Sequence, residues 1–237
     1  MGAHRPSYPS LSALRRACKQ IRAETLKWLY QNMMGFIFID KFLNFAAIAP
    51  PHGSLVRLAL KLRCPTSFLN VDDDLATCLS SIPQLEDLRL RKRVTSGSEC
   101  LLDENRAMTR VIEGLTNLRV LAIIAANDTI PIRVLKNKAK LRRLRLTGHL
   151  SYPSTSPRDG EYKIFADLCS LTHLKLIQVD AALFPPRAIT AFVPLEHFSW
   201  ADYVQPVRGE PITQLHLQHL ADRHVRLKLL YGRLNLT

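Results

Sequence analysis

Two histidines stand at positions where they could hold a metal ion. His173 and His197 each occupy the third position of a short leucine motif, L-x-x-L-x-L, that recurs along the chain. If the two motifs form neighbouring parallel strands, the two side chains lie about 5 Å apart. A zinc or copper site needs a third and a fourth ligand, and His216 is on the same face, two positions further along its own motif. Because the ligand set is incomplete, we interpret these histidines as exposed polar residues and predict no metal and no cofactor.

Motifs that carry catalytic chemistry are absent. The sequence contains no G-x-x-x-x-G-K-[ST], G-x-G-x-x-G, G-x-S-x-G or H-E-x-x-H. Its nine glycines do not cluster as a phosphate-binding loop requires. The five cysteines are scattered without a C-x-x-C pair, so we expect buried free thiols in a reducing compartment. We therefore predict that the protein is not an enzyme.

The charge is strongly positive. There are 33 Lys and Arg residues against 20 Asp and Glu, a formal net charge of +13, which favours acidic partners, nucleic acid or anionic surfaces. One basic run contains no acid: Arg133, Lys136, Lys138, Lys140, Arg142, Arg143 and Arg145. A solvated helix followed by a strand would produce this run, and so would a nuclear-localisation or nucleic-acid patch. No RNP aromatics, GXXG loop or zinc-finger spacing accompanies it.

The leucine motif predicts the elements that position these residues. It begins at Leu55, Leu85, Leu118, Leu141, Leu171 and, more loosely, Leu195 and Ile212. One strand per motif, with a helix between motifs, predicts an α/β solenoid of the leucine-rich-repeat kind, with parallel strands. The intervals are irregular, and the asparagine of regular repeats is missing, so we expect the turns to be satisfied by local backbone bonds or water.

The expected helices follow from apolar periodicity and helix-start signals. An amphipathic helix from Ser10 to about Tyr30 precedes a short strand over Phe36–Ile39 and a helix over Lys41–Ile48. Further helices are expected at about 72–82, 101–114, 132–138, 161–168 and 186–192. The predicted core comprises Leu58, Leu60, Leu88, Leu90, Leu121, Ile123, Leu144, Leu146, Leu174, Leu176, Phe198, Trp200, Leu215 and Leu217.

The N-terminal part carries a family resemblance. The run Cys18-Lys19-Gln20-Ile21-Arg22-Ala23-Glu24, followed by Leu29-Tyr30, the Phe36 and Phe38 pair and the first L-x-x-L-x-L unit, resembles a pattern of fungal F-box-associated proteins with irregular leucine-rich repeats. The specific match covers roughly residues 10 to 62. The resemblance implies a non-catalytic substrate-recognition module of a ubiquitin ligase. An F-box itself is not found, so a ubiquitin-ligase adaptor is implied only if an F-box is encoded upstream.

These observations give an overall expectation. Residues 1–52 form an N-terminal helical cap segment and residues 53–237 form the solenoid. No apolar run approaches the roughly 20 residues of a membrane span, and the N-terminus lacks a signal-peptide core. We therefore expect an intracellular protein, cytoplasmic or nuclear, with no membrane partner.

The binding face follows from the alternation of side chains along a strand. If the motif leucines face the core, the residues between them face outward and join into one surface, normally the concave one. We predict a partner-binding face there, for an acidic, partly apolar peptide or protein surface, with nucleic acid or another polyanion as the alternative. Its residues are Arg57, Lys61, Arg89, Arg91, Val120, Ala122, Ile124, Arg143, Arg145, His173, Lys175 and His197.

Overall fold

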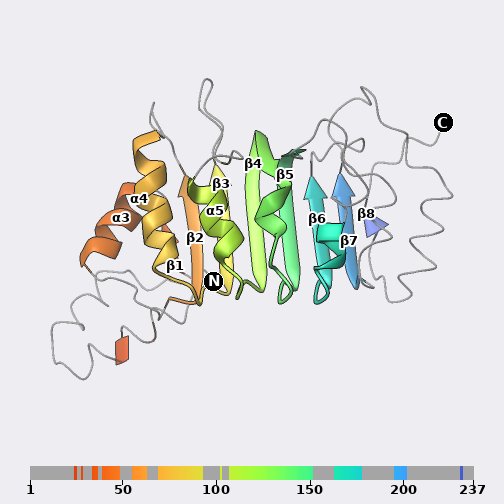
Figure 1. Ribbon diagram of the computed structural model, residues 1–237, viewed down its shortest axis with the longest axis horizontal. Coiled ribbons are helices and arrows are strands. Elements are labelled where there is room, and N and C mark those ends of the chain that lie inside the picture. The colour runs from red at the N-terminus through yellow and green to blue at the C-terminus, as the bar shows by residue number, and fades with distance from the viewer. Residues whose placement is uncertain are drawn as a thin grey trace, which may run out of the picture.

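One parallel sheet organises the part of the chain that the computed structural model describes, namely residues 24–25, 28, 34–36, 39–48, 55–62, 69–92, 102, 107–151, 163–177, 195–201 and 230–231. Its eight strands follow each other in chain order and every neighbouring pair is parallel (Figure 1). They are β1 (Met34–Phe36), β2 (Arg57–Leu62), β3 (Asp87–Lys92), β4 (Val120–Pro131), β5 (Arg143–Ser151), β6 (His173–Ile177), β7 (His197–Ala201) and β8 (Leu230–Tyr231). The predicted α/β class with parallel strands is confirmed.

The motif leucines lie side by side from strand to strand. The fourth motif residues are in register across six strands, as Leu58, Leu88, Leu121, Leu144, Leu174 and Phe198. These residues, and the sixth motif residues from Leu60 to Leu176, are at most 2% exposed. The core prediction is confirmed for them, whereas Leu215, Leu217 and the side chain of Trp200 lie outside the described residues.

In the part of the chain that the structure describes, the helices lie on one face of the sheet (Figure 1). They are α3 (Ile39–Ile48), α4 (Leu69–Ser80), α5 (Ala107–Gly114), the 3-10 helix η1 (Ile132–Leu135) and α6 (Lys163–Ala166). A connection between parallel strands must cross over the sheet, and a helix provides the apolar stripe that covers it. Leu75 and Leu79 of α4 and Met108 and Ile112 of α5 belong to the same buried cluster as the strand leucines.

The predicted boundaries near the N-terminus need correction. The strand covers Met34–Phe36 rather than Phe36–Ile39, and α3 already begins at Ile39. In α3, Asp40 provides the acid of the first turn, and Phe42 and Ala46 are buried on one side of the helix. Likewise, α4 begins at Leu69, before the acidic run that we took as its start.

Several other predictions meet the limits of the described residues. The helix over 186–192, most of the helix over 10–30 and the last motif at 212–217 lie outside them. β7 pairs with β6 on one side and with β8, at Leu230–Tyr231, on the other. β1 and β2 pair directly across the boundary predicted at residue 52. Within the described residues, no helix is long and apolar enough to cross a membrane.

A repeated turn leads into the strands. Residues three and six positions before the first motif leucine are buried in four successive units, and backbone N–H groups bond to carbonyls three residues earlier, as from Leu85 to Ile82 and from Leu171 to Leu168. These turns before the strands are held by local backbone bonds; the expectation for the turns after the strands, where the asparagines are missing, is not tested by them. Side chains add links between turns: Asn117 donates to the Pro83 carbonyl, and Lys140 donates to Asn117.

Lys138 breaks the apolar pattern of this turn. It occupies the position held by Ile82, Leu115 and Leu168 in the other units, and it is fully buried. Its Nζ donates to the carbonyls of Glu113, at the end of α5, and of Lys136, each at 2.9 Å. Burial, opposed in part by the Glu113 charge, lowers the pKa of Lys138 from 10.5 to about 8.

We expect the Lys138 amine to make stability rise with pH. Its folded-state pKa is below the unfolded one, so between about pH 8 and 10.5 the unfolded chain binds more protons and the free energy of unfolding increases with pH. The difference in pKa limits this gain to about 3 kcal/mol. Urea unfolding of the wild type and of Lys138→Leu, measured from pH 7 to 10.5, should show the wild type gaining on the variant as pH rises. Parallel curves would show that Lys138 does not titrate in this window.

Candidate functional site

A hollow lies on the face of the sheet that the helices leave uncovered. Its volume is about 880 Å³, and it extends from β2 to β7. All the residues predicted for the binding face line it except Arg57 and Lys61. Arg57 is exposed on β2 next to the hollow, and the side chain of Lys61 lies outside the described residues. The sequence pattern therefore places most of the predicted residues on one continuous surface.

Two rows of side chains cross this surface perpendicular to the strands. The third motif positions form the first row, which runs in register through Arg57, Asp87, Val120, Arg143, His173 and His197. The fifth positions form the second row, which runs through Ala59, Arg89, Ala122, Arg145, Lys175 and Ser199. Because all strands are parallel and in register, neighbouring members of a row are about 5 Å apart.

Arg89 forms an ion pair with Asp87, two residues earlier on β3. Its Nε and Nη2 donate to the two carboxylate oxygens of Asp87, both at 2.9 Å, in a bidentate pair. The Asp87 side chain is 9% exposed and that of Arg89 52%. The hydrogen bond with Asp87 raises the pKa of the Arg89 guanidinium above its usual value. Sequence reasoning treated Arg89 as an available cation, and the pair corrects this view.

Exposed positive charge is concentrated over β5 and β6, at Arg143, Arg145 and Lys175, and Arg91 adds one more exposed cation on β3. No ion pair joins these four side chains to a carboxylate within the described residues. Between the cations of β5 and β6 and the Arg89–Asp87 pair stands an apolar strip on β4, formed by Val120, Ala122 and Ile124. The hollow thus has a basic half and an apolar strip next to it.

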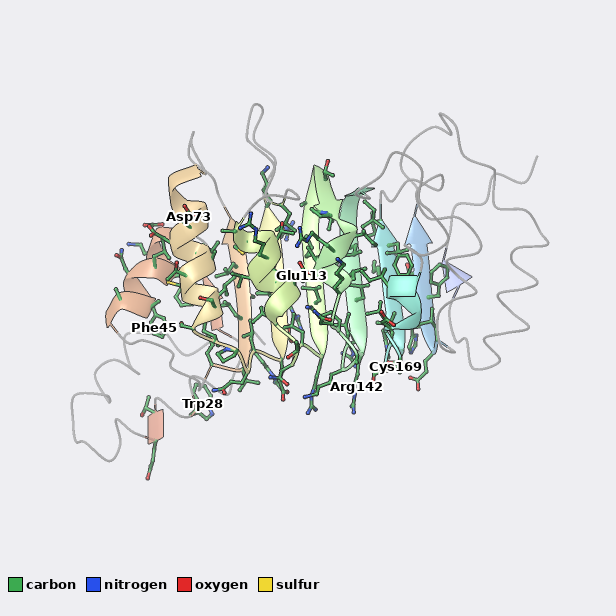
Figure 2. All side chains as sticks on the ribbon, viewed as in Figure 1. Trp28, Phe45, Asp73, Glu113, Arg142 and Cys169 are labelled. Carbon is green, nitrogen blue, oxygen red and sulfur yellow. The ribbon has the colours of Figure 1, made fainter. Side chains whose placement is uncertain are left out.

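The basic run from Arg133 to Arg145 does not form one patch. Arg133 pairs with Glu113 at 2.7 Å, and Lys136 is 3.9 Å from the same carboxylate. Lys138 is buried in the core. Arg142 lies just before the N-terminal end of β5, at the end of the sheet where the strands begin (Figure 2). The prediction of a solvated helix followed by a strand is therefore wrong for Lys138, and a continuous basic patch is excluded because these residues point to different parts of the fold.

The structure describes two cysteines, Cys78 and Cys169. Burial, with a further contribution from Asp74, raises the pKa of the half-buried Cys78, which makes its thiolate scarcer. Cys169 is exposed beside β6 (Figure 2), and its Sγ lies 3.5 Å from the Ala139 carbonyl oxygen. Both are free thiols, as predicted, but neither is fully buried. Cys169 is exposed in the turn that precedes β6, and Cys78 is half-buried on α4.

The histidine pair has the predicted spacing. His173 and His197 are partners in the β6–β7 register, with ring centroids 4.3 Å apart and ring planes inclined by 30°. A third group, the Glu196 carboxylate, stands beside them, so that the possible ligand atoms of the three residues all lie within 4.8 Å of one another. We had considered His216 as the third group. Glu196 was missed because the second motif position points away from the row of third positions in an ideal strand.

Comparisons with protein-family models, with curated proteins and with solved structures found no match to this chain.

The Arg89–Asp87 pair gives a stability prediction. Arg89→Ala removes both donors from a nearly buried carboxylate, so we expect a loss of about 1 kcal/mol in the free energy of unfolding. Arg145→Ala, at the same motif position without a carboxylate partner among the described residues, should change it by less than about 0.5 kcal/mol. The double variant Asp87→Val/Arg89→Ala should be more stable than Arg89→Ala alone, because the unpaired carboxylate is replaced by the valine that stands at the register partner Val120. Equal effects of the two arginine variants in urea unfolding would show that the pair contributes nothing.

Proposed function

We propose that the protein is a non-catalytic protein-recognition module built as an irregular leucine-rich-repeat solenoid, and that it binds an acidic, partly apolar peptide or protein surface. The observation that carries the proposal is the hollow on the open face of the sheet, where exposed arginine and lysine side chains adjoin an apolar strip. Concave, mostly apolar surfaces with a few convergent polar groups are typical binding sites.

The chemistry of the hollow favours a peptide over a nucleic-acid backbone. Arg143 and Arg145 lie two residues apart on one strand, and arginine can bind a carboxylate or a phosphate in a bidentate manner, so the apolar residues beside them decide between the two kinds of ligand. Val120 and Ile124 offer apolar contact area but no donor to a phosphate. A ligand with alternating acidic and apolar side chains satisfies both halves.

The resemblance of the N-terminal run to fungal F-box-associated proteins supports the same class of function. In such proteins the repeats recognise the substrate of a ubiquitin ligase. We therefore propose that this chain recognises a substrate protein, with a cullin-ligase adaptor as a further partner if an F-box is encoded upstream. Co-precipitation from cells tests this link, because recovery of the adaptor would support it and its absence from an otherwise specific complex would remove it.

A direct binding test uses defined probes. We expect fluorescence anisotropy at physiological salt to show tighter binding for peptides that combine Glu with Leu or Phe than for poly-Glu of equal length. The double variant Arg143→Glu/Arg145→Glu should weaken the peptide at least tenfold, since two attractive charges become repulsive. Arg142→Glu is the matched control for the single variant Arg143→Glu: it makes the same charge change at the neighbouring residue, just before β5 and outside the hollow, so it should bind almost as the wild type does.

Two outcomes would contradict the proposal. If Arg142→Glu weakens binding as much as Arg143→Glu, net charge rather than the hollow determines affinity. If duplex DNA or single-stranded RNA binds more tightly than every peptide, with an affinity that falls steeply with salt, the alternative function of a polyanion-binding module replaces the one proposed. Val120→Ser separates the two further, because it removes apolar contact area without adding a charge, and should weaken the peptide while leaving nucleic-acid binding unchanged.

A further inference from the structure

The strands β6 and β7 bring together three side chains with the donor set of a transition-metal site. His173 and His197 offer imidazole nitrogens, and Glu196 offers a carboxylate oxygen, all within 4.8 Å of one another. Two imidazoles and one carboxylate are a ligand set that zinc accepts, with the fourth position left to water or to a bound ligand. We propose that these three residues bind a divalent transition-metal ion, Zn²⁺ in the first place.

The distances are compatible with closure around an ion. Metal–ligand bonds of about 2.0–2.2 Å put the ligand atoms of a tetrahedral site about 3.3 Å apart. The three side chains must therefore approach by at most about 1.5 Å, which side-chain rotation on two fixed strands can supply. All three are partly exposed, so neither strand has to move and an ion can enter from the solvent.

Thr172 prepares one of the ligands. Its hydroxyl donates to the Arg142 carbonyl at 3.2 Å, and the same oxygen lies 2.8 Å from Nδ1 of His173. When the hydroxyl hydrogen is directed to Arg142, its oxygen can accept a hydrogen bond from Nδ1–H of His173. In that tautomer the lone pair of His173 is on Nε2, which could then bind a metal. A hydrogen bond to the other ring nitrogen is the usual way in which proteins fix the tautomer and orientation of a metal-binding histidine.

The neighbouring strand supplies an opposing charge. Arg143 is the register partner of His173 on β5, and its positive charge disfavours a cation beside it. The site is therefore expected to bind zinc with modest affinity. Because the same arginine belongs to the basic half of the hollow, a metal ion at this end would increase the positive charge that a carboxylate ligand meets. The metal site does not require the proposed peptide-binding function, and zinc binding is measured without any peptide.

The test is a calorimetric titration of the full chain with Zn²⁺ in a non-coordinating buffer. We expect one ion per chain at this site. His173→Ala and His197→Ala should each weaken binding at least tenfold, and Glu196→Gln by a smaller factor. Cys169→Ser, which removes the exposed thiol near β6, should retain wild-type affinity. Circular dichroism of each variant verifies that the partly exposed substitutions leave the fold intact.

Two further measurements separate a built site from scattered surface histidines. Thr172→Val should weaken zinc binding about tenfold, in the range typical for loss of such a supporting bond, while Thr172→Ser retains it; Arg143→Gln should strengthen it. Electron paramagnetic resonance with Cu²⁺ as the probe should show coupling to two imidazole nitrogens in the wild type and to one in either histidine variant.

The proposal fails if the wild-type chain binds no Zn²⁺ at millimolar concentration, or if the double variant His173→Ala/His197→Ala binds it as tightly as the wild type. It also fails if zinc binding depends on Cys169 and not on the histidines. None of these results bears on the peptide test, in which the decisive residues are Arg143 and Arg145.

Discussion

The fold depends on one backbone contact that recurs between units. The carbonyl of the second motif residue accepts hydrogen bonds from two successive N–H groups of the next unit, at its second and third motif positions. This occurs at Val56, Glu86, Arg119, Arg142 and Thr172, with distances between 2.7 and 3.0 Å. Since a strand that slipped by one residue would present its leucines to solvent, this contact at the start of each strand fixes both the register and the side of the sheet on which each side chain lies. The hollow and the histidine pair follow from it.

Much of this arrangement could be predicted from the motif alone. The spacing of Leu85, Leu88 and Leu90 gives the buried and exposed positions of a strand, and repetition implies that equal positions are neighbours. The same reasoning correctly placed His173 beside His197. It works because alternation along a strand and register between parallel strands are both fixed by the backbone, independently of which side chains fill the positions.

What the sequence could not provide concerns interactions between particular side chains. Lys138 reads as a member of a basic run, and only its place in the turn, equivalent to Leu115 and Leu168, marks it as buried. The sequence could not predict that Arg89 pairs with Asp87, two residues earlier on the same strand, because another rotamer of Arg89 would point its guanidinium away from that carboxylate. Near the N-terminus, the apolar run from Phe36 to Ile39 fits a strand or a helix, and the structure ends β1 at Phe36 and begins α3 at Ile39.

The uneven spacing of the units has a consequence for how the chain can vary. Register partners on successive strands from Leu58 to Phe198 are 30, 33, 23, 30 and 24 residues apart. Loop-closure entropy grows only with the logarithm of loop length, so the difference between 23 and 33 residues amounts to a few tenths of a kcal/mol. Residues can thus be gained or lost in the crossover segments at little thermodynamic penalty, while the strands and the rows of side chains on the open face keep their order. Length variation and surface chemistry are separated in this architecture.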